Sequence, residues 1–139
     1  MSPLPQEAAL RAAIGATEAQ LFVADIKASC AFYVAKLGFT CVFTYGDPPF
    51  YAHVRRDGGR LNLRCVEQPL VDPGLRAREV FLSATMTIES RAETEALYAE
   101  FTAAGVALAQ ELRQEAWGAW TFIVKDPDGN LLLFAGRDR

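Results

Sequence analysis

The sequence is poor in the residues from which metal centres and disulfide frameworks are built. Its 139 residues include only 3 cysteines and 1 histidine. The cysteines, Cys30, Cys41 and Cys65, are odd in number and form no C-x-x-C pair, so we expect free thiols and neither a disulfide framework nor a zinc cluster. This cysteine usage is typical of a reducing compartment, and we expect a cytoplasmic protein.

Two further absences exclude classes of partner. No run approaches the roughly 18 apolar residues of a membrane span, and residues 1–6 lack the basic start of a secretory signal. The net charge is −3, and no stretch concentrates lysine and arginine as phosphate binding would require. We therefore expect neither a membrane nor a nucleic-acid partner.

What the sequence does contain is typical of one globular domain. A chain of 139 residues with 51% hydrophobic and 22% charged residues can bury roughly two-thirds of its unfolded surface. We predict this domain over residues 17–139. The Ala-rich residues 1–16 are predicted to form either a short helix or an arm on a partner subunit, and the sequence does not separate the two.

One pattern occurs twice along the chain. Strand alternation is followed by helical spacing from Glu18 to Gly38, and again from Leu82 to Gly105. Three stretches of strand character follow each helix, with a glycine turn before the last. The sequence therefore predicts an α+β fold of two tandem βαβββ modules, residues 17–67 and 79–137, forming a cupped, partly open mixed sheet. Residues 68–78 are the predicted linker. A ferredoxin-like dimer is the competing fold, but it has fewer strands after each helix.

The alternation also predicts where a ligand would lie. A helix shields only one face of its sheet, so the other face is free. The free face carries Glu18, Gln20 and Phe22 in the first module and Ser83, Thr85 and Thr87 in the second. Two such sheets side by side would form a trough. The alternative is that this polar face meets water or another subunit.

Two motifs in this order carry a family resemblance. The segment 31–39, Ala-Phe-Tyr-Val-Ala-Lys-Leu-Gly-Phe, and the run Asp126-Pro127-Asp128-Gly129-Asn130 resemble the vicinal oxygen chelate superfamily, over about residues 18–136. That superfamily includes glyoxalase I, extradiol dioxygenases, fosfomycin-resistance enzymes and bleomycin-resistance proteins. The resemblance implies the glyoxalase/bleomycin-resistance fold, and in its enzymes a divalent metal held from the first and last strands of each module.

The residues at those places argue against a metal. The positions matched to the metal ligands are Glu18, Asn62, Ser83 and Leu133, with Thr85 replacing Ser83 if the match shifts by two residues. Only Glu18 is a good ligand, because leucine donates nothing and neutral hydroxyl or amide groups bind weakly. His53 lies in a predicted strand away from this set, and we expect a hydrogen-bonded or surface histidine. We expect no metal and no cofactor.

The segment from Trp117 to Phe122 is similar to the tail of the bleomycin-resistance proteins. This implies a homodimer that binds a flat, often cationic antibiotic between aromatic and acidic groups, without turnover. The predicted ligand-binding residues are Glu18, Gln20, Phe22, Asn62, Arg64, Ser83, Thr85, Trp117, Trp120, Phe122 and Leu133. Trp120 and Phe122 share one phase of alternation, so both face the ligand or both face the core. Arg64 either offers a cation to an anionic ligand or is a solvated edge residue.

We therefore predict a metal-free protein that sequesters a small aromatic or antibiotic-like molecule in the cleft of a homodimer. One alternative is a superfamily enzyme, a lyase or a dioxygenase-like oxygenase, with an atypical or absent metal site and Glu18 as general base. Another is a structural or regulatory partner without a small ligand. The sequence identifies neither the ligand nor whether the modules pair within one chain or between subunits.

Overall fold

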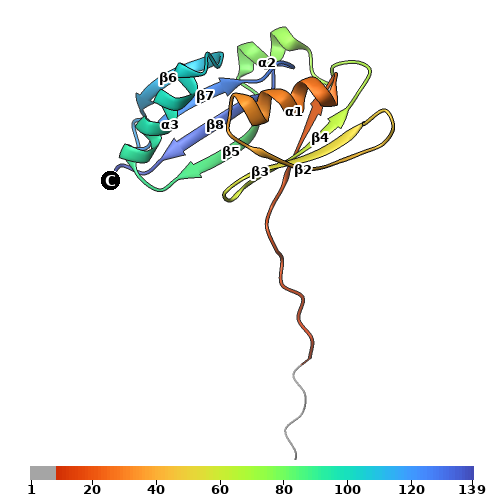
Figure 1. Ribbon diagram of the computed structural model, residues 1–139. Coiled ribbons are helices and arrows are strands. Elements are labelled where there is room, and N and C mark those ends of the chain that lie inside the picture. Colours follow the sequence, from red (N-terminus) through yellow and green to blue (C-terminus); the bar gives the residue numbers. More distant parts are fainter. Residues whose placement is uncertain (1–8) are drawn as a thin grey trace, which may run out of the picture.

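The computed structural model describes residues 9–139 and confirms the fold of two tandem βαβββ modules (Figure 1). The first module contains β1 (Ala19–Val23), α1 (Ile26–Ala35), β2 (Thr40–Tyr45), β3 (Tyr51–Arg56) and β4 (Gly59–Cys65). The second contains β5 (Leu82–Ile88), α3 (Arg91–Ala103), β6 (Leu108–Gln114), β7 (Trp120–Lys125) and β8 (Leu131–Gly136). Between them lies α2 (Pro73–Glu79).

Each module forms a four-stranded mixed sheet. The strand orders are β1-β4-β3-β2 and β5-β8-β7-β6. In each sheet the first strand pairs in parallel with the last strand of its module, and the remaining pairs are antiparallel. This equivalence of the two sheets is the structural counterpart of the repeated sequence pattern.

The predicted N-cap residues and the glycines that end the helices are in the expected places. The Asp25 side chain accepts a hydrogen bond from the Ala28 backbone N at 3.2 Å, and Ser90 caps α3 in the same way through Glu93. Gly38 and Gly105 follow the two helices with φ of 71° and 75°, a conformation that glycine adopts without strain. These caps fix the ends of the helices that cover one face of each sheet.

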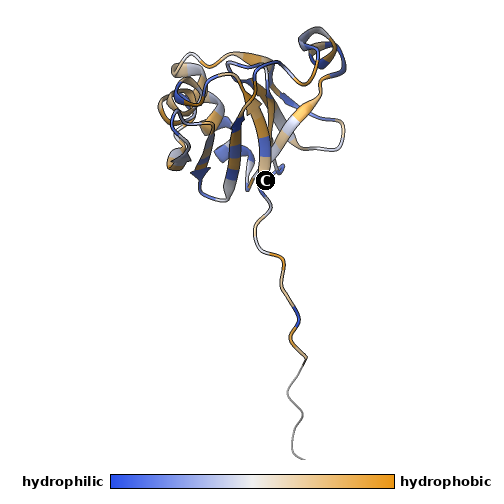
Figure 2. Ribbon diagram, turned by 90° about the vertical axis from the view of Figure 1, so that its right-hand side faces the viewer, coloured by the Kyte–Doolittle hydropathy of each residue, from blue (hydrophilic) through white to orange (hydrophobic). Residues whose placement is uncertain are grey.

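The two modules share one hydrophobic core. Tyr33 and Phe39 from the first module lie in the same buried cluster as Phe101, Phe122 and Phe134 from the second. The rings of Phe122 and Phe134 stack at 5.1 Å. Figures 1 and 2 show α1 and α3 on the same side of the sheets, with hydrophobic segments along the strands and helices beneath. The opposite side of both sheets is left without a helix from either module, and we call it the open side.

The linker contains a helix that was not predicted, and the leading segment contains none within its described residues. The linker contains α2, which begins at Asp72-Pro73 because the Asp72 side chain accepts from the Leu75 backbone N at 2.8 Å and proline suits the first helical turn. Residues 9–18 form no helix or strand and lead away from the domain (Figures 1 and 2). The predicted short helix is thus absent from residues 9–16, while the rest of that segment, residues 1–8, lies outside the described residues. The arm stays a prediction.

The described residues also bear on two expectations about environment. Within residues 9–139 no helix is long and apolar enough to cross a membrane. The three cysteines are free thiols, and the Sγ atoms of Cys30 and Cys41 lie 4.0 Å apart. Burial, together with the neighbouring Cys41, raises the pKa of Cys30 to about 11, so this thiol stays protonated near neutral pH.

Candidate functional site

The strand register assembles most of the predicted polar residues on the open side of the first sheet. Asn62 on β4 lies between Gln20 on β1 and His53 on β3. In the next row Arg64 lies between Phe22 and Tyr51. Because side chains two residues apart on a strand share a face, these two rows form one continuous surface. The sequence-predicted group of Glu18, Gln20, Phe22, Asn62 and Arg64 is therefore brought together.

His53 is part of this surface, and the prediction that it lies away from the matched set is wrong. Its Nδ1 atom is 2.7 Å from Asn62 Oδ1 and 3.2 Å from Glu18 Oε1. The reason is the β3–β4 hairpin, whose ladder places His53 directly opposite Asn62. The expectation that the histidine is hydrogen-bonded does hold.

An aromatic surface, which the sequence reasoning missed, adjoins this histidine. The Phe43 ring stacks on His53 at 5.8 Å between centroids and on Tyr51 at 6.2 Å. We call Phe43, Tyr51 and His53 the aromatic shelf. Phe43 is 49% exposed, so one side of its ring remains available to a flat ligand. Stacking on such a ring contributes about 0.5–1.5 kcal/mol beyond area burial.

On the second sheet, the positions matched to metal ligands carry Ser83, Thr85 and Leu133. Thr85 lies beside Leu133, because a bulge between Leu82 and Ala84 takes Ser83 out of the ladder. Ser83 instead donates through its hydroxyl to Asn130 Oδ1 at 3.2 Å. Residues 9–139 contain no group of three or more His, Cys, Asp or Glu side chains that could hold a metal ion. Glu18 and His53 alone fall short of the three protein ligands usual for a catalytic metal, so the residues present do not fit one.

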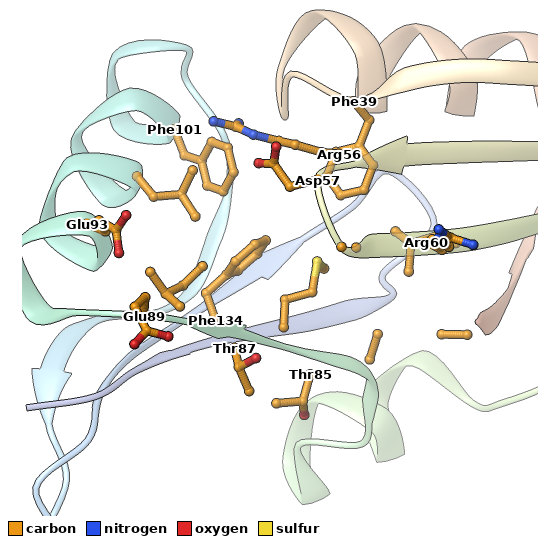
Figure 3. A pocket seen from close by; sticks show the side chains of 18 of the residues that line it. Phe39, Arg56, Asp57, Arg60, Thr85, Thr87, Glu89, Glu93, Phe101 and Phe134 are labelled. Atoms are coloured by element: carbon orange, nitrogen blue, oxygen red, sulfur yellow. The ribbon is translucent and has the colours of Figure 1, made fainter. Parts of the chain in front are cut away.

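A cleft of about 730 Å³ lies between the two modules. Figure 3 shows Phe101 and Phe134 on one side, Phe39 and Arg56 on the other, and Thr85 and Thr87 along β5. This cleft contains the predicted Thr85 but not Glu18, Gln20 or Phe22. The rings of Phe39, Phe101 and Phe134 that line it are at most 3% exposed, so the cleft presents little aromatic surface to a ligand.

An ion pair between the modules lines this cleft. Arg56 donates to both carboxylate oxygens of Glu100. These hydrogen bonds lower the pKa of Glu100 and raise that of Arg56. The two charged groups of this pair satisfy one another, while Asp57, Arg60, Thr85 and Thr87 also line the cleft.

A second pocket, of about 680 Å³, lies on the open side beneath the linker, and we call it the linker pocket. Its apolar lining comes from the linker, from β1 and from the second sheet: Phe22, Leu70, Val71, Val80, Leu108, Ile123 and Leu131. Three cationic residues, Arg76, Arg113 and Lys125, also line it. Phe22 belongs both to this pocket and to the polar surface of the first sheet, so the two form one continuous region.

The aromatic residues near the end of the chain are placed differently from the prediction. Phe122 is 0% exposed and packs in the core, so its assignment as a ligand-stacking surface is wrong. Trp120 is two residues from Phe122 and lies on the same face of β7. The indole N–H of Trp120 donates to Asp138 Oδ1 at 3.3 Å, and the Arg91 guanidinium lies 4.0 Å from the centre of the indole ring. Trp117 is 76% exposed but lines neither the cleft nor the linker pocket. The core alternative therefore holds for Phe122, because its face of β7 is the one covered by α3.

The Asp126–Asn130 turn joins the two modules. Asp126, 3% exposed, accepts from the Tyr33 hydroxyl at 2.9 Å and from the Asn130 side chain at 2.9 Å. Burial raises the pKa of Asp126, while these hydrogen bonds oppose the rise. The turn also reaches β1 and its end, since Asn130 donates to the Phe22 carbonyl at 3.1 Å and Asp128 accepts from the Ala24 N–H at 2.8 Å. It thereby fixes β1 beside the linker pocket.

Comparison with known proteins places this geometry in a family. The model of the glyoxalase/bleomycin resistance protein/dioxygenase superfamily matches residues 15–134. The chain belongs to this superfamily. No curated protein matches the sequence. The superfamily contains both enzymes and proteins that bind without catalysis, so membership alone does not decide between them.

Solved structures support the fold at low sequence identity. A superfamily protein from Alicyclobacillus acidocaldarius has a TM-score of 0.72 and 22% identity, covering 88% of this chain and 91% of that one. The bleomycin-binding protein of Streptomyces verticillus, in complex with copper(II)-bleomycin, has a TM-score of 0.69 and 22% identity, covering 92% and 100%. A lactoylglutathione lyase from Agrobacterium tumefaciens has a TM-score of 0.67 and 17% identity, covering 91% and 96%. At these identities the likeness shows the fold alone.

Proposed function

We propose that this protein binds a small aromatic molecule on its open side, without a metal and without turnover. The observation that carries the proposal is the linker pocket, whose volume of about 680 Å³ lies within the roughly 300–1,000 Å³ of small-molecule sites. Its lining is largely apolar and is continuous through Phe22 with the polar surface of the first sheet.

The charges around the pocket favour an anionic group on the ligand. Arg76, Arg113 and Lys125 line it, and Arg64 is opposite Phe22 in the ladder. Glu67 and Asp128 are the acidic residues of the lining. Arg113 is already paired with Glu115 and Asp128 is bonded to the Ala24 backbone, so Arg76 and Lys125 against Glu67 set the local charge balance. The balance supports an aromatic acid over the flat cation implied by the bleomycin-resistance resemblance. Glu18, Gln20 and Asn62 would then orient the polar parts of the ligand that extend over the sheet.

The proposal includes a homodimer in which a second copy covers part of the open side. Exposed apolar side chains lie on β2 and the β2–β3 turn outside the aromatic shelf, namely Val42, Tyr45 and Phe50, and the rings of Tyr45 and Phe50 are in contact. Exposed apolar side chains of this kind are typical of an interaction site. Sedimentation would give a mass near twice 15.2 kDa for the dimer, and a monomer at all concentrations would contradict this part of the proposal.

The test uses 8-anilinonaphthalene-1-sulfonate, an aromatic anion that fluoresces in apolar surroundings. We expect saturable binding with one site per chain. Leu70 lines the pocket and is 62% exposed, so Leu70→Glu should leave the fold intact while placing a carboxylate against the probe. The dissociation constant should rise at least about fivefold, from lost apolar contact and charge repulsion.

Leu75 provides the matched control, because it lies on α2 and is 37% exposed but does not line the pocket. Leu75→Glu should bind the probe as the unmodified protein does. Equal weakening by both substitutions, or no saturable binding to the unmodified protein, would refute the linker pocket as the ligand site. Thr85→Phe fills the inter-module cleft instead, and a selective loss in this variant would move the site there.

The alternative function is an enzyme of the superfamily, and one observation favours it: Glu18 lies against His53 on the open side. A carboxylate–histidine pair is a common element of acid–base catalysis. Loss of activity in Glu18→Gln, in any turnover assay with a superfamily substrate class, would support this alternative over binding alone.

A further inference from the structure

The strongest unassigned feature on the open side is the single histidine of the chain. The His53 ring is held between strands, with 11% of its side chain exposed, and is stacked against Phe43 with an interplanar angle of 17°. A ring fixed by stacking on one side and by hydrogen bonds at one nitrogen presents its other nitrogen in a defined direction.

The partners of Nδ1 decide which nitrogen carries the proton. Asn62 Oδ1 lies at 2.7 Å and Glu18 Oε1 at 3.2 Å from Nδ1. An ionised carboxylate can only accept hydrogen bonds. Even if the Asn62 amide were rotated to present its NH₂ group, Glu18 would still require a donor at Nδ1. Nδ1 therefore bears the hydrogen, and in the neutral ring Nε2 carries the lone pair.

Nε2 is left without a partner but within reach of solvent. Among the described residues, His53 is hydrogen-bonded only through Nδ1. In that same part of the chain, the fully buried side-chain nitrogen and oxygen atoms without a partner are Ser29 Oγ and Arg60 Nε, and Nε2 is not one of them. The shelf thus offers a flat aromatic surface with one open hydrogen-bond acceptor in its plane.

The charged groups around this acceptor are basic apart from Glu18. Arg55 and Tyr51 flank His53 on the same face of β3, and Arg60 and Arg64 flank Asn62 on β4. On β2 the neighbouring residues are Phe43 and, one row further, Tyr45. These surroundings favour an electron-rich aromatic ring that carries a hydroxyl group. The nearby cations can interact with the hydroxyl oxygen while Nε2 accepts a hydrogen bond from the hydroxyl hydrogen.

We propose that His53 selects hydroxylated aromatic ligands, with the phenolic O–H donating to Nε2 and the ring stacking on Phe43. Glu18 and Asn62 act as positioning residues that hold the tautomer. The inference rests on the proposed function, because the same ligand would extend from the linker pocket onto the aromatic shelf. The added point is the chemical class of the ligand group on the shelf, a hydroxylated aromatic ring.

The test compares 2-naphthol with 2-methoxynaphthalene by calorimetry at pH 8. The two differ in one hydrogen-bond donor, so the unmodified protein should prefer the naphthol about five- to tenfold. His53→Phe keeps a flat ring and removes Nε2. This variant should bind the two naphthalenes with about equal affinity. Leu75→Glu should keep the full preference.

A second measurement does not depend on the folding of a variant. Because the chain has 1 histidine, the imidazole ¹⁵N resonances in a spectrum of the unmodified protein are unambiguous. We expect a protonated Nδ1 and an unprotonated Nε2, with 2-naphthol shifting Nε2 selectively. In Glu18→Gln the tautomer should become mixed and the naphthol preference should drop.

Each contrary outcome has a distinct meaning. Equal affinity for the two naphthalenes, no binding of 2-naphthol, or a protonated Nε2 in the neutral ring would overturn the role of His53. If saturable anilinonaphthalene sulfonate binding persists in these cases, the linker-pocket proposal still stands. Loss of binding of both probes would refute the two together.

Discussion

The buried hydrogen bond between Tyr33 and Asp126 should make the stability of this protein respond to pH in a specific way. The Tyr33 hydroxyl donates to Asp126 Oδ2 at 2.9 Å, and both residues are at most 3% exposed. In Tyr33→Phe the carboxylate keeps its hydrogen bonds from Asn130 and from two backbone N–H groups. A hydrogen bond to a charged group contributes about 1.5–3 kcal/mol, and the remaining donors favour the lower end.

The sign of the pH dependence follows from the pKa of Asp126. Burial raises this pKa in the folded protein above its ordinary value of 3.8. The folded state therefore takes up a proton more readily than the unfolded state, and the contribution of Asp126 to stability declines as pH rises from the unfolded value through the folded one. Above that window the carboxylate is ionised and depends most on its donors.

Urea denaturation of Tyr33→Phe should therefore show a loss of about 1.5 kcal/mol at pH 7.5. The loss should become smaller as the pH is lowered toward the ordinary carboxyl range, because the raised pKa of Asp126 favours the protonated carboxyl in the folded state. The pKa of Tyr33 itself is raised well above 10 by burial and by Asp126, so the tyrosine stays neutral throughout this range. Tyr98→Phe is the control, since Tyr98 packs against Phe122 without a carboxylate partner among the described residues. Equal losses across this pH range, or a loss as large in the control, would refute the reasoning.

Three other predictions concern the modules and the metal. Gly136→Ala should cost about 1–3 kcal/mol of unfolding free energy in denaturant titrations, because the new Cβ would lie 1.7 Å from Thr94 Oγ1, whereas Gly58→Ala meets nothing within 4 Å; a harmless Gly136→Ala would contradict the close packing of α3 on β8. Glu100→Gln should cost at most about 1 kcal/mol in low salt, as expected for a partly exposed pair. That loss should fade as pH falls below the ordinary range of glutamate, since the pKa of Glu100 is lowered in the fold, and a salt-independent loss would argue against the ion pair. Calorimetric titration with Zn²⁺, Ni²⁺, Mn²⁺ or Fe²⁺ should show no stoichiometric binding, and binding that disappears in Glu18→Ala would overturn the metal-free proposal.

The fold was predictable because its signals are local and repeated. Alternation, Asp25 and Ser90 as caps, and Gly38 and Gly105 as helix ends each depend on neighbouring residues only, and each recurs in the second module. The linker helix was missed because its signal, Asp72 followed by Pro73, is short and lies among other proline and glycine residues that favour turns.

The site was only partly predictable because it depends on pairing between strands. Alternation places Glu18, Asn62 and Arg64 on one face, but it does not say which residue of β3 lies opposite Asn62. The turn residues Asp57 and Gly58 between β3 and β4 supply that information, since a two-residue hairpin fixes the register. Extending the pairing of Arg56 with Gly59 along the ladder puts His53 opposite Asn62. The placement of Phe122 had no such local signal, because both faces of β7 are buried.

The turn that marks the family in the sequence has a physical role that links the fold to the proposed site. Asn130 and Asp128 bond to the end of β1, the strand that carries Gln20 and Phe22, while Gly129 and Leu131 beside them line the linker pocket. Tyr33 ties the same turn to α1 through Asp126. The wall of the pocket and the polar surface next to it are therefore held by one hydrogen-bonded network. A ligand that spans both would meet groups whose spacing is set before it binds, which reduces the entropy lost on association.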